Sequence, residues 1–453
     1  MPQDLTTGPI ASNLLRFALP LMIGNLLQQL YNVCDTWVVG RFLGPEALAA
    51  VGSSYALMVF LTSIFLGLCM GSGAAFAIQY GRRDEEQLKS SMFISFVLIA
   101  LVTLLLNVAV FAGLDGIIQL LQVSGEVAPL MHDYLWIIFW GMGATFLYNY
   151  FANLLRAVGD SLTPLAFLGV SAILNVVLDL IFVLIFAWGI QGAAIATVIA
   201  QLVAGLGILV YTLVRFPQLR LARRHLRWHK QIAVDIAGLS FLTCLQQSVM
   251  NFGILMVQGL VNSFGTVIMA AFAAAVKIDS FAYMPVQDFG NAFATYVAQN
   301  HGAGQGERIE QGIRSAAVTV FVFCLFISLG VCLLARPLME IFVRPEETAI
   351  IAAGVHYLRI EASFYLGIGI LFLLYGFYRA INRPAMSVVL TVISLGTRVI
   401  LAYGLSAIPA IGVTGIWAAV PIGWILADLV GILYYRKNRR RFLGLSTARL
   451  KSA

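Results

Sequence analysis

Two carboxylic acids and one amide stand out in this chain because each lies inside a long apolar run. Asp35 falls within residues 14–39, and Asn175 and Asp179 fall within residues 163–187. A charged side chain costs about 2.5 to 3.5 kcal/mol at the centre of a membrane-embedded helix, so such a residue is kept for a reason. Since Asn175 and Asp179 are four positions apart, they project from one face of a helix, one turn apart.

The depths of these residues predict that they meet Thr197. At 1.5 Å per residue, Asp35 lies about 9 Å, and Asp179 and Thr197 lie about 12 Å, from the same expected end of their helices. Two carboxyl groups in such a pocket can hold a proton, because burial and like-charge repulsion both disfavour the charged form. Carboxylate, amide and hydroxyl oxygens also suit a small hard cation such as sodium. Alternatively, these side chains only cap or join helices.

Membrane-spanning helices must position these residues. A chain of 453 residues that is 60% hydrophobic and 11% charged cannot cover the surface of a soluble globule. Runs long enough to cross about 30 Å of hydrocarbon predict twelve transmembrane helices, and hence an all-α integral membrane protein. They lie at residues 14–39, 47–77, 90–112, 129–154, 163–187, 190–214, 234–262, 266–298, 311–335, 354–378, 384–407 and 412–435.

The second half of the chain repeats the first. GIQGAAIATVIAQLVAGLGILVY at residues 189–211 returns as GVTGIWAAVPIGWILADLVGILY at residues 412–434. Six helices per repeat is an even number, so the repeats enter the membrane in the same sense and are related by a pseudo-twofold axis along its normal. We expect two six-helix bundles, typical of a transporter that rocks one bundle against the other. The expected parts are an N-lobe (1–214), a basic linker (215–233), a C-lobe (234–435) and a basic tail (436–453).

The positive charges predict the orientation. Most of the 28 Lys and Arg residues fall on one side if both termini are cytoplasmic, as expected for short loops. These flanks explain the net charge of +7, so we expect membrane lipids rather than nucleic acid beside the linker. Residues 1–13 lack the pattern of a signal peptide, and we expect none to be cleaved.

Three segments resemble the multidrug and toxic compound extrusion (MATE) exporters, in their DinF-like branch. They are LRFALPLMIGNLLQQLYNVCDTWVVGRFLG, YVAQNHGAGQGERI and LLRAVGDSLTP, and the resemblance covers nearly the whole chain. It implies a bacterial inner-membrane protein and a first-lobe proton or cation site. That site would comprise Asp35, Asn175, Asp179 and Thr197, with Asn153 as a further member.

The resemblance also assigns a role to Pro20, which matches a proline about which the first helix bends when the site is protonated. From the residues alone, Pro20 removes one helical hydrogen bond and is either a hinge or a passive kink. One departure concerns the NorM branch, whose second-lobe acidic cluster includes a glutamate in the seventh helix. Residues 234–262 contain an acid only at Asp235, which argues against a NorM-style sodium site.

The second lobe carries five further polar candidates in its apolar runs: Lys277, Asp279, Asp288, Arg398 and Asp428. Charges inside membranes usually pair, so we expect Asp279 to meet Arg398, and Lys277 to meet Asp428 or Asp288. Direct contact with substrate or proton is the alternative. Glu361 lies near a predicted helix end, where we expect it to be solvated or paired close to Arg359.

The sequence thus predicts a secondary multidrug efflux antiporter that exports lipophilic, often cationic compounds in exchange for protons, with sodium as the other coupling ion. We expect a monomer without a cofactor, and no GxxxxGK[ST] nucleotide loop occurs in the sequence. Scattered Cys and His residues predict neither a metal centre nor a hydrolase triad, so we expect no enzyme. A lipid or lipid-linked precursor flippase is the alternative. An aspartyl dyad enzyme is disfavoured, because transport explains the duplication.

Overall fold

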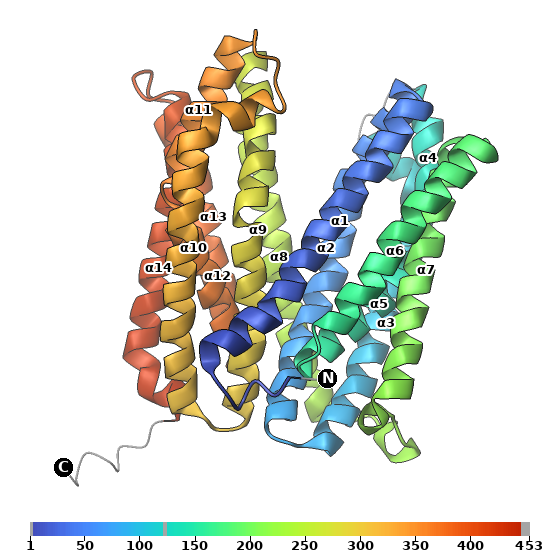
Figure 1. The fold of residues 1–453 in the computed structure, drawn as a ribbon, viewed down its shortest axis with the longest axis vertical. Helices are drawn as coiled ribbons and strands as arrows, with labels where there is room; N and C mark the ends of the chain where they lie inside the picture. The colour runs from blue at the N-terminus through green and yellow to red at the C-terminus, as the bar shows by residue number, and fades with distance from the viewer. Residues whose placement is uncertain (1–2, 121–124, 445–453) are drawn as a thin grey trace. The chain divides into compact units, whose positions relative to one another are not determined.

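The computed structural model describes residues 3–120 and 125–444, which are helices joined by short turns, with no strand in those ranges (Figure 1). The first half contains α1 (Ile10–Phe42), α2 (Pro45–Gly81), α3 (Glu85–Leu120), α4 (Val127–Trp140), α5 (Met142–Ala157), α6 (Leu162–Leu180), a π-helix (Ile181–Ile185) and α7 (Gly189–Arg215). Two 3-10 turns follow at Pro217–Leu219 and Arg223–His225. The second half contains α8 (Lys230–Asn262), α9 (Thr266–Gly302), α10 (Gly306–Glu340), α11 (Thr348–Ala362), α12 (Tyr365–Ala380), α13 (Pro384–Ser406) and α14 (Val413–Leu443).

The predicted spans are helical, but two of them are broken. Among the described residues, ten helices are long and apolar enough to cross a membrane, and α11 with α12 forms one more span that is bent by 51°. The span expected at residues 129–154 is divided at Gly141 into α4 and α5, of 14 and 16 residues. Neither reaches across about 30 Å of hydrocarbon alone.

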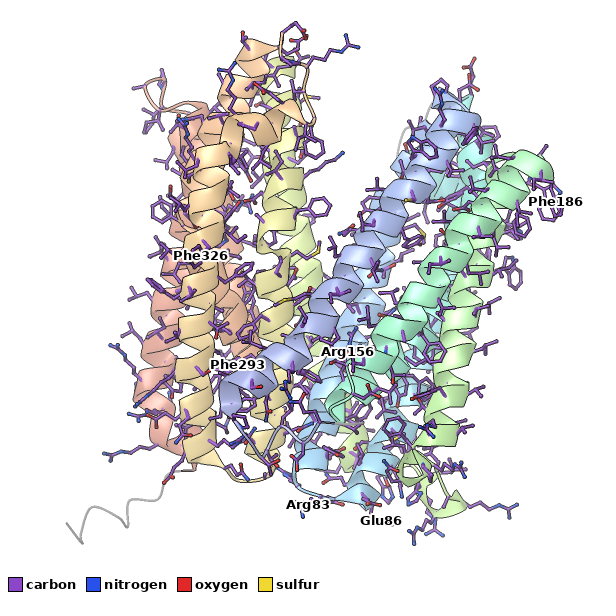
Figure 2. The ribbon with its side chains drawn as sticks, in the orientation of Figure 1. Arg83, Glu86, Arg156, Phe186, Phe293 and Phe326 are labelled. Atoms are coloured by element: carbon purple, nitrogen blue, oxygen red, sulfur yellow. The ribbon has the colours of Figure 1, made fainter. Side chains whose placement is uncertain are left out.

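Large apolar side chains point outward from these helices, as lipid contact requires. Phe326 of α10 is 69% exposed, whereas Phe293 of α9 is 1% exposed and lies in the core (Figure 2). Leu333 and Ile400 are exposed to a similar degree as Phe326. A soluble surface does not carry so many exposed apolar groups, so the chain is an integral membrane protein.

The helices group into two compact units. The first unit comprises Met1–Asp4 and Leu19–Cys244, and the second comprises Leu5–Ala18 and Leu245–Ala453. In the first unit α7 packs against α5 and α6, and in the second α14 packs against α13 and α9 against α12. The unit boundaries fall inside α1 and α8, and the linker expected at residues 215–233 belongs to the first unit.

The last helix runs further than expected. α14 continues to Leu443, where Phe442 contacts Tyr378 of α12 and Tyr434 of α14 itself, with ring centroids 6.3 and 5.6 Å apart. These aromatic contacts explain why the first part of the expected basic tail is helical. Residues 445–453 of that tail lie outside the described residues.

Two glycines of α2 bring α8 close within the first unit. Gly67 and Gly71 lie one turn apart, and a methyl group on either would lie 2.5 Å from a backbone Cα, that of Cys244 or Ser240 respectively. The hydroxyl of Ser72 also lies 2.9 Å from that of Ser240. Small residues at this spacing let helix backbones approach closely in membranes.

We therefore expect Gly71→Ala to destabilise the protein by about 1 to 3 kcal/mol, the usual cost of overpacking a tight contact. Thermal unfolding of the detergent-solubilised protein measures this change. Gly52→Ala is the matched control in the same helix, because a methyl group there meets nothing within 4 Å. Equal melting temperatures for the two variants would show that the contact between α2 and α8 is loose.

Candidate functional site

The first unit brings together the four polar residues expected to meet. Asp35 comes from α1, Asn175 and Asp179 from α6, and Thr197 from α7. Asp179 is 0% exposed and Asn175 is 1% exposed, and the other two are also buried. The Asn175 amide donates a hydrogen bond to the Thr197 hydroxyl at 3.2 Å, which ties α6 to α7.

Most acceptor atoms of this group receive no hydrogen bond. The Thr197 hydroxyl donates to the Ala193 carbonyl at 3.1 Å. Both carboxyl oxygens of Asp179, one of Asp35 and the amide oxygen of Asn175 are buried and accept no hydrogen bond from any described residue. Buried acceptors without a donor are costly. These oxygens can therefore accept a proton or bind a cation.

The two carboxyl groups are close enough to interact with each other. A direct hydrogen bond between two carboxyl groups requires that one of them carry a proton, since two carboxylates are both acceptors. Like charges this close in a buried site also repel strongly. The arrangement can hold one proton between Asp35 and Asp179, or a small cation.

Two tyrosines lie near the carboxyl groups. Tyr31 of α1 and Tyr134 of α4 both interact electrostatically with Asp35 and Asp179. Neither tyrosine was among the residues expected at the site. Tyr31 could have been found, because it lies four positions before Asp35 on one helix face. Tyr134 carried no such signal, because only packing brings α4 to this place.

An irregular turn follows Asp179 and fixes the start of α7. α6 widens into the π-helix Ile181–Ile185, a form that often occurs at functional sites. The chain then turns through Ala187 and Gly189, with φ of 54° and 59°. Phe182 and Trp188 stack at 4.9 Å across this turn, near Phe186 at the end of the bundle (Figure 2). This packing holds α7 where Thr197 can face Asn175.

Asn153 does not belong to this group, so that expectation was wrong. Its side-chain amide donates to the Asn149 carbonyl at 2.8 Å, and its Cβ lies against Gly73 of α2. Asn153 is nineteen residues beyond Tyr134, which corresponds to about 28 Å along the helices at 1.5 Å per residue. The helices that run between these two residues carry Asn153 toward the other end of the bundle.

Pro20 lies within α1, two residues after Ala18, which is the last residue of α1 that belongs to the second unit. Its ring nitrogen cannot donate the helical hydrogen bond to residue 16, which leaves a weak point in the helix. α1 nevertheless continues through it to Phe42. The hinge role of Pro20 stays a prediction.

The second unit contains a buried group of its own. Asp279 of α9 accepts a hydrogen bond from the Tyr365 hydroxyl of α12 at 2.7 Å. Glu361 of α11 and Arg398 of α13 are charged neighbours of Asp279. Arg398 forms no salt bridge within 4 Å in the described part of the chain. It therefore balances the two acids from a longer distance than the direct ion pair with Asp279 that the sequence predicted.

The expectation for Glu361 was wrong. Its side chain is 1% exposed rather than solvated, and Tyr357 lies beside it. The reason is the 51° bend between α11 and α12, which follows directly after Glu361. A broken span places its helix end inside the bundle, where a straight helix would have placed it at the surface.

Lys277 does not form the ion pair expected of it. Lys277 is exposed, and within residues 3–120 and 125–444 it forms no salt bridge with Asp288 or Asp428. Asp288 is buried in α9 and Asp428 in α14, with one Asp428 oxygen near Gly367 of α12. Helix spacing could not show that Lys277 is exposed.

We expect Arg398→Leu to destabilise the protein, because the buried acids Asp279 and Glu361 lose the positive charge that balances them. The loss should be larger at pH 8 than at pH 5, because protonated acids need no counter-charge. Adding Glu361→Gln should restore part of the stability. Melting temperatures at both pH values measure this, with Arg359→Leu, at an exposed position of α11, as the control. A loss that is independent of pH and of Glu361→Gln would contradict the charge balance.

Known proteins share this architecture. A family model described as MatE matches residues 20–181 and 239–404, which is most of the chain. This chain belongs to the MATE family. It is a membrane transporter and not an enzyme, as the sequence predicted. No cluster of three or more His, Cys, Asp or Glu residues that could hold a metal occurs among the described residues.

Relatives of this MATE protein cover its full length. The probable multidrug resistance protein YpnP of Bacillus subtilis is 30% identical over 98% of this chain and 99% of its own. A protein of Shewanella oneidensis named FAD transporter is 27% identical over 96% of each chain. A solved outward-facing structure of a multidrug resistance MATE family transporter aligns with a TM-score of 0.90 at 24% identity, over 97% of this chain and 98% of that one. That similarity concerns the fold.

Proposed function

We propose that this MATE protein is a secondary antiporter that exports small lipophilic, often cationic compounds in exchange for protons bound by Asp35 and Asp179. The observation that carries the proposal is the buried pair of interacting carboxyl groups whose oxygens lack donors. A proton satisfies such a pair directly. The positive-inside pattern supports a plasma-membrane protein with both termini in the cytoplasm.

Replacement of one positive charge by another would couple the entry of protons to the export of the drug. With the carboxyl groups ionised, the first unit is anionic in its interior and attracts a lipophilic cation. Protonation removes that charge and lowers the affinity for the cation, so the proton and the drug exclude each other without contact. Pro20 would allow α1, which carries Asp35, to bend between the two states.

A proton needs fewer ligands at this site than a sodium ion does. A hard cation is bound by several oxygens at once. Four oxygens of the group lack donors, and the Thr197 hydroxyl already donates to Ala193 and accepts from Asn175. A proton needs only one carboxyl oxygen, which either aspartate provides.

The names of the relatives indicate different substrates, so the substrate of this protein must be found by experiment. The Bacillus subtilis protein is named for multidrug resistance, whereas the Shewanella oneidensis protein is named for FAD, which is anionic. The buried acids of the first unit favour a cation here. Arg398 could attract an anion, but it already lies beside Asp279 and Glu361. A lipid or lipid-linked precursor as substrate is therefore less favoured.

The direct test is efflux of a lipophilic cation, tetraphenylphosphonium, from proteoliposomes under an imposed pH gradient. We expect Asp35→Asn and Asp179→Asn to lower pH-driven efflux at least tenfold, because an amide cannot exchange a proton in this range. Asp115→Asn is the control, since its carboxyl group lies in the same unit and is 86% exposed. Undiminished efflux by both variants would refute the coupling site. Movement of a fluorescent lipid instead of the cation would favour a flippase.

The variant Asn175→Ala distinguishes proton coupling from sodium coupling. We expect it to keep most of the pH-driven efflux, because the proton is held by the carboxyl groups. Any efflux driven by a sodium gradient should be lost, because the amide oxygen is one of the few ligands available. Each gradient is imposed separately in the same proteoliposomes. Loss of pH-driven efflux together with retained sodium-driven efflux would contradict proton binding by the aspartates.

A further inference from the structure

Residues 215–230 connect α7 to α8 and are folded onto the first unit rather than left as an open loop. Three side chains anchor this segment: Phe216, Leu219 and His225 are 4%, 3% and 2% exposed. Arg220 closes the end of α7, where its guanidinium donates to the Leu213 carbonyl at 2.6 Å. The remaining side chains of the segment are exposed.

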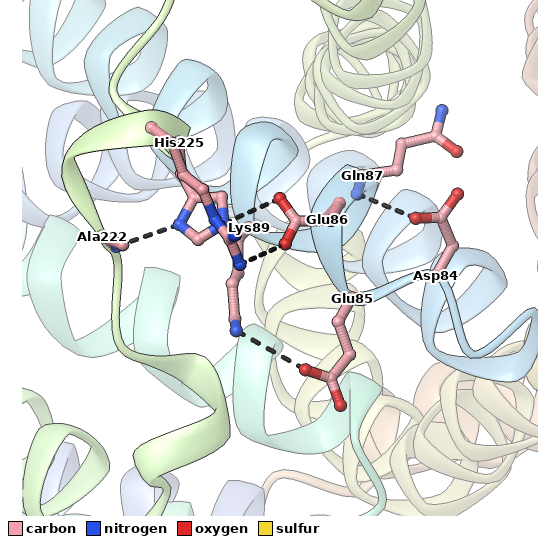
Figure 3. A network of polar contacts seen from close by, with 8 residues as sticks. Asp84, Glu85, Glu86, Gln87, Lys89, Ala222 and His225 are labelled. Carbon is pink, nitrogen blue, oxygen red and sulfur yellow. Dashed lines mark hydrogen bonds and ion pairs between the residues drawn. The ribbon is translucent and has the colours of Figure 1, made fainter.

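A polar network fixes the segment to the start of α3 (Figure 3). The backbone N–H of Ala222 donates to Nδ1 of His225 at 2.9 Å, so the ring proton lies on Nε2, which is 2.9 Å from Glu86. Arg224 also forms a salt bridge with Glu86 at 2.6 Å. The neighbouring acid Glu85 is paired with Lys89 at 3.5 Å. Both glutamates at the start of α3 are thus already engaged.

Five of the six Lys and Arg residues of the segment form no salt bridge in the described part of the chain, and one of these, Arg220, donates only to backbone carbonyls. The sequence from residue 215 to residue 230 contains no Asp or Glu. Arg215, Arg223, Arg227 and Lys230 are exposed and take part in no salt bridge in the part of the chain that the structure describes. The buried anchors hold the backbone of the segment, while these cations are exposed.

Apolar side chains alternate with these cations. Leu221, Leu226 and Trp228 are 40%, 49% and 53% exposed. Tryptophan and arginine at the ends of membrane-spanning helices prefer the level of the lipid headgroups. An acidic soluble protein would match the charges but would leave no reason for exposed Leu and Trp beside the bilayer.

We propose that residues 215–230 form a binding surface for anionic phospholipids of the cytoplasmic leaflet. The cations contact the lipid phosphates, and Trp228 with Leu226 enters the headgroup layer. Basic residues near a membrane surface attract anionic lipid in this way, and the attraction weakens with salt. Neither the transported compound nor the coupling ion enters this binding, so it can be tested without transport.

The experiment compares phosphatidylglycerol with phosphatidylcholine bound to the purified full-length protein, by native mass spectrometry. We expect the wild-type protein to prefer phosphatidylglycerol, and R223Q/R227Q to lose about fivefold of that preference for each arginine removed. R41Q/R344Q is the control, because it removes the same net charge from two exposed positions outside the segment. Equal preference in the wild-type protein and in R223Q/R227Q would overturn the proposal and leave the surface to a soluble acidic partner.

A second readout locates the lipid. Brominated phosphatidylglycerol in nanodiscs should quench the fluorescence of the wild-type protein more than brominated phosphatidylcholine does. Trp228→Phe should lose that difference, and about 1 M salt should reduce it in the wild-type protein. Since Trp228 is exposed, this variant should fold. A difference that survives both Trp228→Phe and high salt would show that the lipid binds elsewhere.

Discussion

Two carboxyl groups that share a buried site repel each other when both are ionised, and a proton or a cation between them relieves that repulsion. This constraint dominates the first unit, because Asp35 and Asp179 interact where most of their oxygens meet no donor. The elements around them help to position that pair. α6 and α7 are joined by Asn175 and Thr197, and the π-helix and its aromatic turn hold α7 in register.

The second unit solves the same problem in a different way. Asp279 and Glu361 are also buried acids, but Arg398 supplies a permanent positive charge and Tyr365 supplies a donor. A group with a built-in counter-charge has less need of an exchangeable ion. The two halves share an ancestor by their sequence repeat, and their buried charges now differ. That difference agrees with a coupling role for the first unit.

The surface of the first unit adds a third electrostatic arrangement. Glu86 pairs with Arg224 and His225. The other cations of residues 215–230 are therefore able to bind an external partner. Charges that a soluble protein would pair internally are here directed outward. The same physical rule governs the interior and this surface, because each charge is stable only beside an opposite charge, a proton or water.

The sequence by itself determined the all-α membrane class, the twelve helical segments, the repeat and the meeting of Asp35, Asn175, Asp179 and Thr197. Apolar run length and helix depth are local properties, and both can be counted along the chain. Only the tertiary structure decided that Tyr134 lies at the site, that Asn153 does not, that Glu361 is buried and that Lys277 is exposed. Those outcomes depend on helix breaks at Gly141 and after Glu361 and on the rotation of each helix about its axis. Contacts between distant segments set breaks and rotations, and periodicity within one helix carries no information about them.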